Sequence, residues 1–163
     1  MKKYLPPFIL FIFSALTSCG QKTFDEKMQS LYKNTVPLIS VDSLNDRLGE
    51  AVLLDTRAQN EFEISHIQGA RFIEYDAFKI KDVKDLPKDQ EIIVYCSVGY
   101  RSERIGEKLQ KAGYTNVKNL YGGIFDWKNQ GKEVVGMNEK PTDSVHTYNK
   151  NWGKWLFKGV KVY

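Results

Sequence analysis

The chain has 163 residues, which is enough for one ordinary domain with short extensions. Its composition, with 42% apolar and 27% charged residues, is that of a folded globular protein and excludes a wholly disordered one. A net charge of +4 spread over scattered basic residues does not indicate nucleic-acid binding, and two cysteines with two histidines indicate neither a disulfide framework nor a metal site.

Residues 1–18 have the pattern of a secretory signal peptide. Two lysines precede an apolar run over residues 8–13, which is shorter than the roughly 20 residues that a membrane span needs. The stretch Leu16-Thr17-Ser18-Cys19 resembles the lipobox of bacterial lipoproteins, which implies cleavage before Cys19 and lipid attachment to its sulfur. We therefore expect a lipid-anchored protein of the bacterial cell envelope that faces the periplasm or the exterior. The alternatives are an uncleaved anchor and a plain secreted protein.

A lipidated tether and a helix are expected over residues 19–37, ahead of the main domain. Apolar residues recur there at helical spacing, which predicts a helix that packs on the domain through Phe24, Met28, Leu31 and Tyr32. Asp42 or Ser43 is expected to cap the next helix, which would run to Leu48.

Short apolar runs predict five strands, with helical patterns between them. These runs span residues 38–39, 51–55, 71–74, 92–95 and 117–120. The alternation of strands and helices predicts an α/β fold with a mostly parallel sheet that is covered on both faces.

The fourth predicted strand leads directly into a loop with a single cysteine, Cys96. From Arg101 onward, apolar residues recur at helical spacing, so Cys96 is expected at the N-terminus of a helix. Unpaired N–H groups and the helix dipole favour an anion there, and the loop should therefore stabilise the thiolate. Gly99 allows the loop to curl so that N–H groups converge on the sulfur. A lone cysteine in this place is, however, often only a small core residue.

The last predicted helix begins near Ile124, after the tight turn Tyr121-Gly122-Gly123. The C-terminal extension, residues 137–163, carries more apolar mass than a disordered end would. Lys158-Gly159 predicts a small hairpin within it. We expect the extension to pack on the domain as an extra layer. The sharper alternative is that its aromatic residues wall one side of the mouth above Cys96 and restrict the substrate.

The spacing Cys96-x4-Arg101 on a strand, loop and helix resembles the active-site loop of the rhodanese family. Further stretches resemble that family's signature sequences in the same order, namely Leu53-Leu54-Asp55-Thr56-Arg57, Glu61-Phe62, His66-Ile67-Gln68-Gly69-Ala70 and Tyr121-Gly122-Gly123-Ile124-Phe125-Asp126-Trp127. The resemblance covers residues 38–136 and implies a single rhodanese-like domain, with five central strands and helices on both faces.

The resemblance also implies a reaction. Cys96 would be the catalytic residue, taking sulfur from a small anionic donor such as thiosulfate and passing it from a persulfide to a thiol or a cyanide-like acceptor. Arg101 would hold the anionic donor, and the loop N–H groups would cradle the terminal sulfur. The substrate-binding residues would be Ser97, Val98, Gly99, Tyr100 and Arg101. No metal, nucleotide, flavin or other cofactor is implied.

Three polar residues outside the loop are interpreted as structural support. Asp55 and Arg57 are expected to pair and to brace neighbouring loops. His66 could be assigned as a general base, but in rhodanese-like domains this histidine ties down its own loop through hydrogen bonds.

Two other functions fit parts of the pattern. Cell-cycle phosphatases share the rhodanese fold, but their loop is Cys-x5-Arg because a phosphate is larger than a sulfur atom, so the shorter loop here favours sulfur. A membrane-tethered module that relays its persulfide to an envelope protein would use the same cysteine without efficient turnover.

Overall fold

The computed structural model describes residues 23–163. The predicted signal peptide, residues 1–18, and the predicted lipidation site, Cys19, lie outside the described residues. The described helices are α1 (Phe24–Gln29), α2 (Val41–Asn45), α3 (Gln59–Ile64), η1 (Ile80–Val83), α4 (Tyr100–Lys111), α5 (Gly123–Asn129) and α6 (Lys150–Gly153). Among these helices, none is long and apolar enough to cross a membrane.

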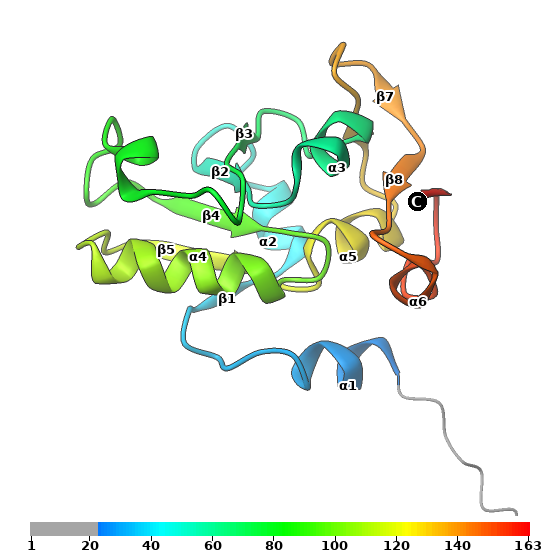
Figure 1. Cartoon of the computed structure of the whole chain (residues 1–163), viewed down its shortest axis with the longest axis horizontal. Helices are drawn as coiled ribbons and strands as arrows, with labels where there is room; N and C mark the ends of the chain where they lie inside the picture. Colours follow the sequence, from blue (N-terminus) through cyan, green and yellow to red (C-terminus); the bar gives the residue numbers. More distant parts are fainter. Residues whose placement is uncertain (1–22) are drawn as a thin grey trace, which may run out of the picture.

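The central element is a parallel sheet of five strands (Figure 1). Its strands are β1 (Leu38–Ile39), β2 (Val52–Asp55), β3 (Arg71–Phe72), β4 (Ile92–Tyr95) and β5 (Val117–Leu120). They lie in the order β1-β5-β4-β2-β3, and every neighbouring pair is parallel. This confirms the predicted α/β class. The carboxyl end of β4, where Cys96 follows, lies between two neighbouring strands, the usual place for a ligand site in such sheets.

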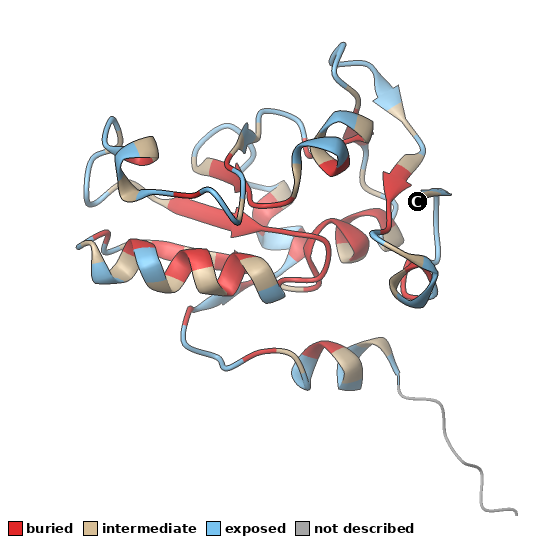
Figure 2. Ribbon diagram, viewed as in Figure 1, coloured by how far each residue is buried: buried red, intermediate tan, exposed pale blue. Residues whose placement is uncertain are grey.

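Strand β4 is buried along its whole length (Figure 2). Its side chains alternate between two hydrophobic clusters. Ile93 and Tyr95 belong to the cluster that includes residues of α1, α2 and α5. Ile92 and Val94 belong to the cluster that includes residues of α4 and η1. Because both faces are covered, the strand is a continuous apolar run, as its sequence indicated.

Two predicted boundaries are wrong. The helix expected to be capped by Asp42 or Ser43 and to run to Leu48 is α2, which ends at Asn45; it begins earlier because the Ser40 hydroxyl caps it and accepts the Ser43 N–H. The strand expected over residues 71–74 ends at Phe72. That strand, β3, has β2 as its only neighbour, and β2 ends at Asp55, directly opposite Phe72.

The N-terminal extension packs on the domain as predicted. Met28 and Tyr32 are buried within the cluster that includes α5. The linker after α1 is fastened to α4 by the buried carboxylate of Glu103, which accepts hydrogen bonds from the backbone N–H groups of Lys33 and Thr35, each over 3.0 Å. The extension is thereby held close to the start of α4.

The C-terminal extension is not a hairpin, which corrects that prediction. After the short antiparallel pair β6 (Val134–Val135) and β7 (Pro141–Thr142), strands β8 (Ser144–His146) and β9 (Val160–Val162) pair in parallel. The connection between β8 and β9 contains α6 and inserts Trp155 and Leu156 into the core, so the chain returns to the same end before β9 begins. Figure 1 shows α1 and α6 on the same side of the molecule, where Phe24 contacts Trp155 and Phe157.

Candidate active site

Cys96 lies in a tight loop between β4 and α4, and its side chain is only 1% exposed. The N–H of Gly99 donates a hydrogen bond to Cys96 Sγ over 3.2 Å. Gly99 has a φ of +91°, and a Cβ at this position would lie 2.5 Å from Tyr32 Oη, so only glycine fits. The twelve-residue helix α4 begins at the next residue, with its positive end at the loop. The Gly99 N–H group and the start of α4 therefore both present positive dipole ends to the sulfur.

Four consecutive carbonyl groups of the loop are held by the protein behind it. The hydrogen bonds run from Ile124 N to Cys96 O (2.9 Å), from Phe125 N to Ser97 O (3.1 Å), from Tyr32 Oη to Val98 O (2.7 Å) and from Asn119 Nδ2 to Gly99 O (2.9 Å). These hydrogen bonds to the carbonyl oxygens fix the loop in a conformation that directs the Gly99 N–H group at the sulfur. Such preorganised donors stabilise an anion without rearrangement.

Glu61 of α3 joins the loop to the rest of the site. Its carboxylate receives two hydrogen bonds from Arg101, from Nη1 over 2.7 Å and from Nη2 over 2.8 Å. Ser97 Oγ donates to Glu61 over 2.9 Å and accepts from Arg101 Nη2 over 3.0 Å. The three side chains form a closed network, which fixes the guanidinium of Arg101 beside the loop.

The carboxylate of Glu61 and the guanidinium of Arg101 stabilise each other's charged forms. Burial alone would raise the pKa of Glu61, but hydrogen bonds and positive charge from Arg101, with a further contribution from Arg57, lower it to about 2. Burial would lower the pKa of Arg101, but its hydrogen bonds to Glu61 and the nearby Cys96 sulfur raise it. Arg101 therefore keeps its positive charge next to the cysteine.

A cavity of about 470 Å³ opens above Cys96. Its floor includes the loop residues Cys96, Ser97 and Val98, together with Arg101. Its walls are largely aromatic and come from separate parts of the chain, namely Leu31, Tyr75, Tyr100, Tyr148 and Trp152. Tyr148 and Trp152 of the C-terminal extension thus line the mouth above Cys96, whereas Trp155 and Leu156 are buried as the expected packed layer. Restriction of the substrate by this extension stays a prediction.

The three residues interpreted as structural lie beside the loop region. Arg57 and Asp55 form a fully buried ion pair with Nη2 and Oδ2 2.6 Å apart, and Arg57 also donates to the carbonyl of Ser65. The ring of His66 stacks on Phe62 with centroids 4.0 Å apart, and its Nδ1 lies 3.1 Å from the Phe62 carbonyl oxygen. These contacts fasten α3 and the segment that follows it.

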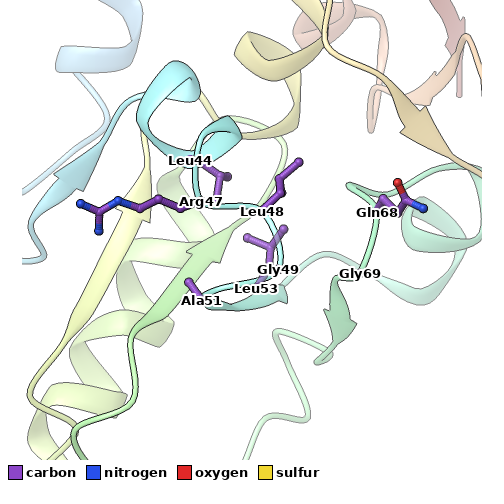
Figure 3. Close-up of a pocket in the computed structure, with 8 residues that line it drawn as sticks. All are labelled: Leu44, Arg47, Leu48, Gly49, Ala51, Leu53, Gln68 and Gly69. Atoms are coloured by element: carbon purple, nitrogen blue, oxygen red, sulfur yellow. The ribbon is translucent and has the colours of Figure 1, made fainter.

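A second cavity of about 290 Å³ lies between α2, the start of β2 and the segment before β3 (Figure 3). It is lined mainly by Leu44, Leu48, Ala51 and Leu53. The guanidinium of Arg47 points away from the other lining side chains and pairs with Glu91 over 3.1 Å. The lining contains no nucleophile or carboxylate, so this cavity has no means of acid–base or nucleophilic chemistry.

Sequence reasoning missed four residues that hold the site together, Glu61, Tyr32, Asn119 and Gly123. Glu61 and Gly123 carried a signal, because Glu61-Phe62 and Tyr121-Gly122-Gly123 lie in stretches that resemble the rhodanese family. The others act through contacts between segments that are distant in the chain.

Comparisons with known proteins agree with this geometry. The model of the rhodanese-like domain family matches residues 40–130, which is more than half of the chain. A sulfurtransferase from Allochromatium vinosum is 32% identical over 100 residues, which is 60% of this chain and 92% of the relative. The adenylyltransferase and sulfurtransferase UBA4 of Candida albicans is 32% identical over 118 residues, but the match spans only 26% of that protein's length.

Solved structures show the same fold. The crystal structure of a rhodanese-related protein from Thermoplasma volcanium aligns with a TM-score of 0.56 and 28% identity, covering 61% of this chain and 97% of that one. The family match over residues 40–130 contains strands β2 to β5 and the cysteine loop, and both terminal extensions lie outside it. The chain therefore belongs to the rhodanese-like domain family.

Proposed function

We propose that the protein is a sulfurtransferase that moves sulfane sulfur from an anionic donor such as thiosulfate to a thiophilic acceptor. The Cys96 thiolate attacks the outer sulfur of thiosulfate, the S–S bond of the donor breaks, and sulfite leaves with the bonding electron pair. The resulting Cys96 persulfide then transfers its outer sulfur to a thiol or cyanide and regenerates the thiolate. The observation that carries this proposal is the hydrogen bond from Gly99 N–H to Cys96 Sγ in a loop whose carbonyl groups are all held.

The loop residues have separate roles in this proposal. N–H groups from Ser97 to Arg101 cradle the terminal sulfur, and Arg101 attracts the anionic donor and the departing sulfite. Since Glu61 already occupies one edge of the Arg101 guanidinium, the donor meets its remaining N–H groups. Tyr100, which is 46% exposed at the mouth, and Val98 contribute to selectivity.

Replacement of the nucleophile tests the proposal. Cys96→Ser should abolish transfer of sulfur from thiosulfate to cyanide, because a serine hydroxyl forms no persulfide, while the circular dichroism spectrum remains that of the wild type. Mass spectrometry of the wild-type protein after thiosulfate treatment should show one added sulfur on the peptide that contains Cys96. Activity that persists in Cys96→Ser would refute the proposal.

Two further measurements separate the alternatives. Efficient hydrolysis of an aryl phosphate by the wild type would assign the protein to the phosphatases instead. A persulfide that forms on Cys96 but reaches small thiols and cyanide only at a negligible rate would indicate a relay module that serves a protein acceptor of the cell envelope.

We also propose that the lipid on Cys19 anchors the protein in the cell envelope, with the domain facing the periplasm or the exterior. The support is the Leu16-Thr17-Ser18-Cys19 stretch after a short apolar run. Metabolic labelling with a clickable palmitate analogue should mark the wild type and not Cys19→Ser. Equal labelling of the two proteins, or labelling of neither, would exclude lipidation at this residue. Cys96→Ser, which keeps the lipobox, is the matched control and should be labelled like the wild type.

A further inference from the structure

We propose that the C-terminal extension carries a docking surface that rests on the anionic headgroups of a lipid bilayer. The proposal builds on the proposed lipid anchor at Cys19, to which it adds a second contact with the membrane. The docking surface consists of exposed apolar side chains and exposed lysines, namely Phe157, Val160, Tyr163, Lys154, Lys158 and Lys161. They belong to the end of the molecule that carries α6 and the C-terminus (Figure 1).

The charged side chains of this segment have one sign. Residues 147–163 contain four lysines and no aspartate or glutamate, and all four lysines are exposed. The ion pairs that lysines form within residues 23–163 involve Lys118, Lys128 and Lys132 and none of these four. The acidic side chains of the neighbouring helix α1, Asp25 and Glu26, both accept hydrogen bonds within the protein. The segment therefore has positive charge available for an anionic lipid surface.

Large apolar side chains of the same segment face the solvent. Phe157 is 63% exposed, and Val160 and Tyr163 are each 57% exposed. They are interleaved with Lys158 and Lys161, and every residue from 157 to 161 is exposed. A single exposed apolar residue is ordinary, but apolar and aromatic side chains interleaved with lysines are typical of segments at a membrane interface. There the rings enter the headgroup region while the ammonium groups meet the anionic lipids.

The backbone that presents Phe157 is held by the domain. Asn129 Oδ1 accepts hydrogen bonds from the backbone N–H groups of Phe157, over 2.6 Å, and of Lys158, over 3.3 Å. The Phe157 ring packs edge-on against Phe24, with centroids 5.9 Å apart, and Trp155 just before it is buried in the core. Because the segment is already ordered, contact with a membrane would cost little conformational entropy.

The short distance along the chain from the lipidation site to the fold is what commits this surface to a bilayer. Thr23, the first described residue, is only four positions after Cys19. An extended chain spans at most about 3.6 Å per residue, so Cys19 lies within roughly 14 Å of Thr23. The next residue, Phe24, contacts Phe157. A lipid on Cys19 would thus bring the docking surface to the bilayer, where a weak contact becomes effective because it is intramolecular.

The docking surface borders the cavity above Cys96. Trp152, which lines that cavity, is two positions before Lys154 at the end of α6. Leu31, on the same cavity wall, follows α1, and Lys27 of α1 lies 5.1 Å from the Trp152 ring. Docking would therefore hold the mouth of the cavity close to the lipid headgroups.

Vesicle binding by a chain without the lipid tests the docking surface separately from the anchor. Residues 19–163 with Cys19→Ser contain every described helix and strand, and no lipid can attach. In co-sedimentation, vesicles of phosphatidylcholine with phosphatidylglycerol should bind this chain about tenfold or more tightly than vesicles of phosphatidylcholine alone. Binding should weaken as the salt concentration rises, because salt screens the lysines.

Two variants of this chain remove the two kinds of contact. Phe157→Ala should weaken binding to the mixed vesicles about fivefold, because an apolar ring no longer enters the interface. Lys154→Gln combined with Lys158→Gln should weaken it about tenfold or more and reduce its dependence on salt. These side chains are exposed, so the circular dichroism spectrum and Tm should stay close to those of the parent chain.

Matched controls come from the rest of the surface. Lys81→Gln combined with Lys84→Gln removes two exposed lysines beside Val83, which packs in the other hydrophobic cluster. Leu48→Ala removes an apolar side chain that is 41% exposed after α2. Both control variants should bind the mixed vesicles as the parent chain does. In the lipidated full chain on the same vesicles, amide hydrogens of residues 157–161 should exchange more slowly than in detergent micelles.

The outcomes distinguish the docking surface from the anchor. Absence of vesicle binding, or equal binding by the parent chain, Phe157→Ala and the Lys154 and Lys158 double variant, would overturn the docking surface. A dimer in sedimentation that Phe157→Ala dissociates, without vesicle binding, would assign the surface to a second copy of the chain and also overturn the proposal. Palmitate labelling of Cys19 without vesicle binding would leave the anchor standing, whereas lysine-dependent vesicle binding without labelling would support the docking surface and refute the anchor.

Discussion

Glu61 does not line the cavity, but its carboxylate pairs with Arg101 and keeps that guanidinium charged beside Cys96. Its carboxylate is 1% exposed and receives hydrogen bonds from Arg101, Ser97 and the backbone N–H of Ala58. A carboxylate in this position without its partners would be strongly destabilising, and so would an unpaired Arg101. The pairing with Glu61 therefore keeps the Arg101 cation in a fixed position beside the cysteine.

The first prediction concerns acid unfolding. Because the folded state lowers the Glu61 pKa from its usual value of about 4.5 to about 2, the ionised carboxylate stabilises the fold above pH 4.5. This stabilisation should be lost as the pH falls from 4.5 towards 2, by about 3 kcal/mol in total. Glu61→Gln, which cannot titrate, should be less stable at pH 7 and should lose less stability over this pH range. Urea unfolding at a series of pH values measures both effects.

Glu63→Gln is the matched control, since it removes an exposed carboxylate from the same helix. Its loss of stability with falling pH should follow that of the wild type. An unchanged pH dependence in Glu61→Gln would mean that the buried pair does not govern acid unfolding.

The starts of two helices meet at the cysteine loop. α4 supplies the positive end that faces the sulfur, and the first N–H groups of α5 bind the carbonyl oxygens of Cys96 and Ser97. This close approach requires glycine at position 123, where φ is +56° and a Cβ would lie 2.2 Å from Cys96 O. Gly123 is thus a positioning residue that acts through the loop backbone.

The second prediction compares two glycine substitutions. Gly123→Ala should lower the free energy of unfolding by about 2–4 kcal/mol, because the added methyl group forces α5 away from the loop and strains the backbone. Gly113→Ala also places alanine at a positive φ, +90°, but its Cβ would meet no atom within 4 Å. This control should lose only about 1 kcal/mol, the cost of the left-handed backbone.

Activity separates the two variants further. Gly123→Ala should reduce kcat for sulfur transfer at temperatures where it remains folded, since the loop carbonyl groups lose two hydrogen bonds. Gly113→Ala should keep the wild-type kcat. Equal unfolding free energies for the two variants would show that α5 does not fix the loop.

The extensions and the rhodanese-like domain share one hydrophobic core. Met28 and Tyr32 before the sheet, and Trp155 and Leu156 after it, belong to the same buried cluster as Ile93 and Tyr95 of the central strand. The Tyr32 hydroxyl also reaches the cysteine loop, where it donates to Val98 O and accepts from Gly122 N. The described chain is therefore expected to unfold as a single cooperative unit.

The third prediction tests this cooperativity. Met28 is fully buried, and Met28→Ala should destabilise the protein by about 2–5 kcal/mol through lost burial and the cavity left behind. Fluorescence of the tryptophans and circular dichroism of the helices should show one coincident transition, shifted to lower urea concentration. Gln29→Ala, an exposed neighbour on α1, should leave the midpoint nearly unchanged. Separate transitions for the extensions and the domain would contradict a shared core.

Local patterns were sufficient for the features that depend on neighbouring residues. The apolar run before Cys96, the helical spacing after Arg101 and the glycine between them specify a strand, a loop and a helix, because each conformation is governed by residues within a few positions. The α/β class follows from the alternation of such elements. The ends of α2 and β3 were mispredicted because a serine cap and the length of a neighbouring strand determine them.

The sequence by itself thus determined where Cys96 lies and what kind of sheet presents it. The tertiary structure alone decided which groups surround that cysteine. Glu61 and Arg101 are 40 positions apart, and Tyr32 and Val98 are 66 apart, so their contacts exist only after distant elements have packed. The parallel course of β9 and the aromatic wall of the cavity have the same origin, because buried Trp155 and Leu156 carry the tail back across the domain. The recurrence of apolar residues and the spacing within a motif describe one helix, strand or loop at a time. The contacts around Cys96 depend instead on how several elements share a single core.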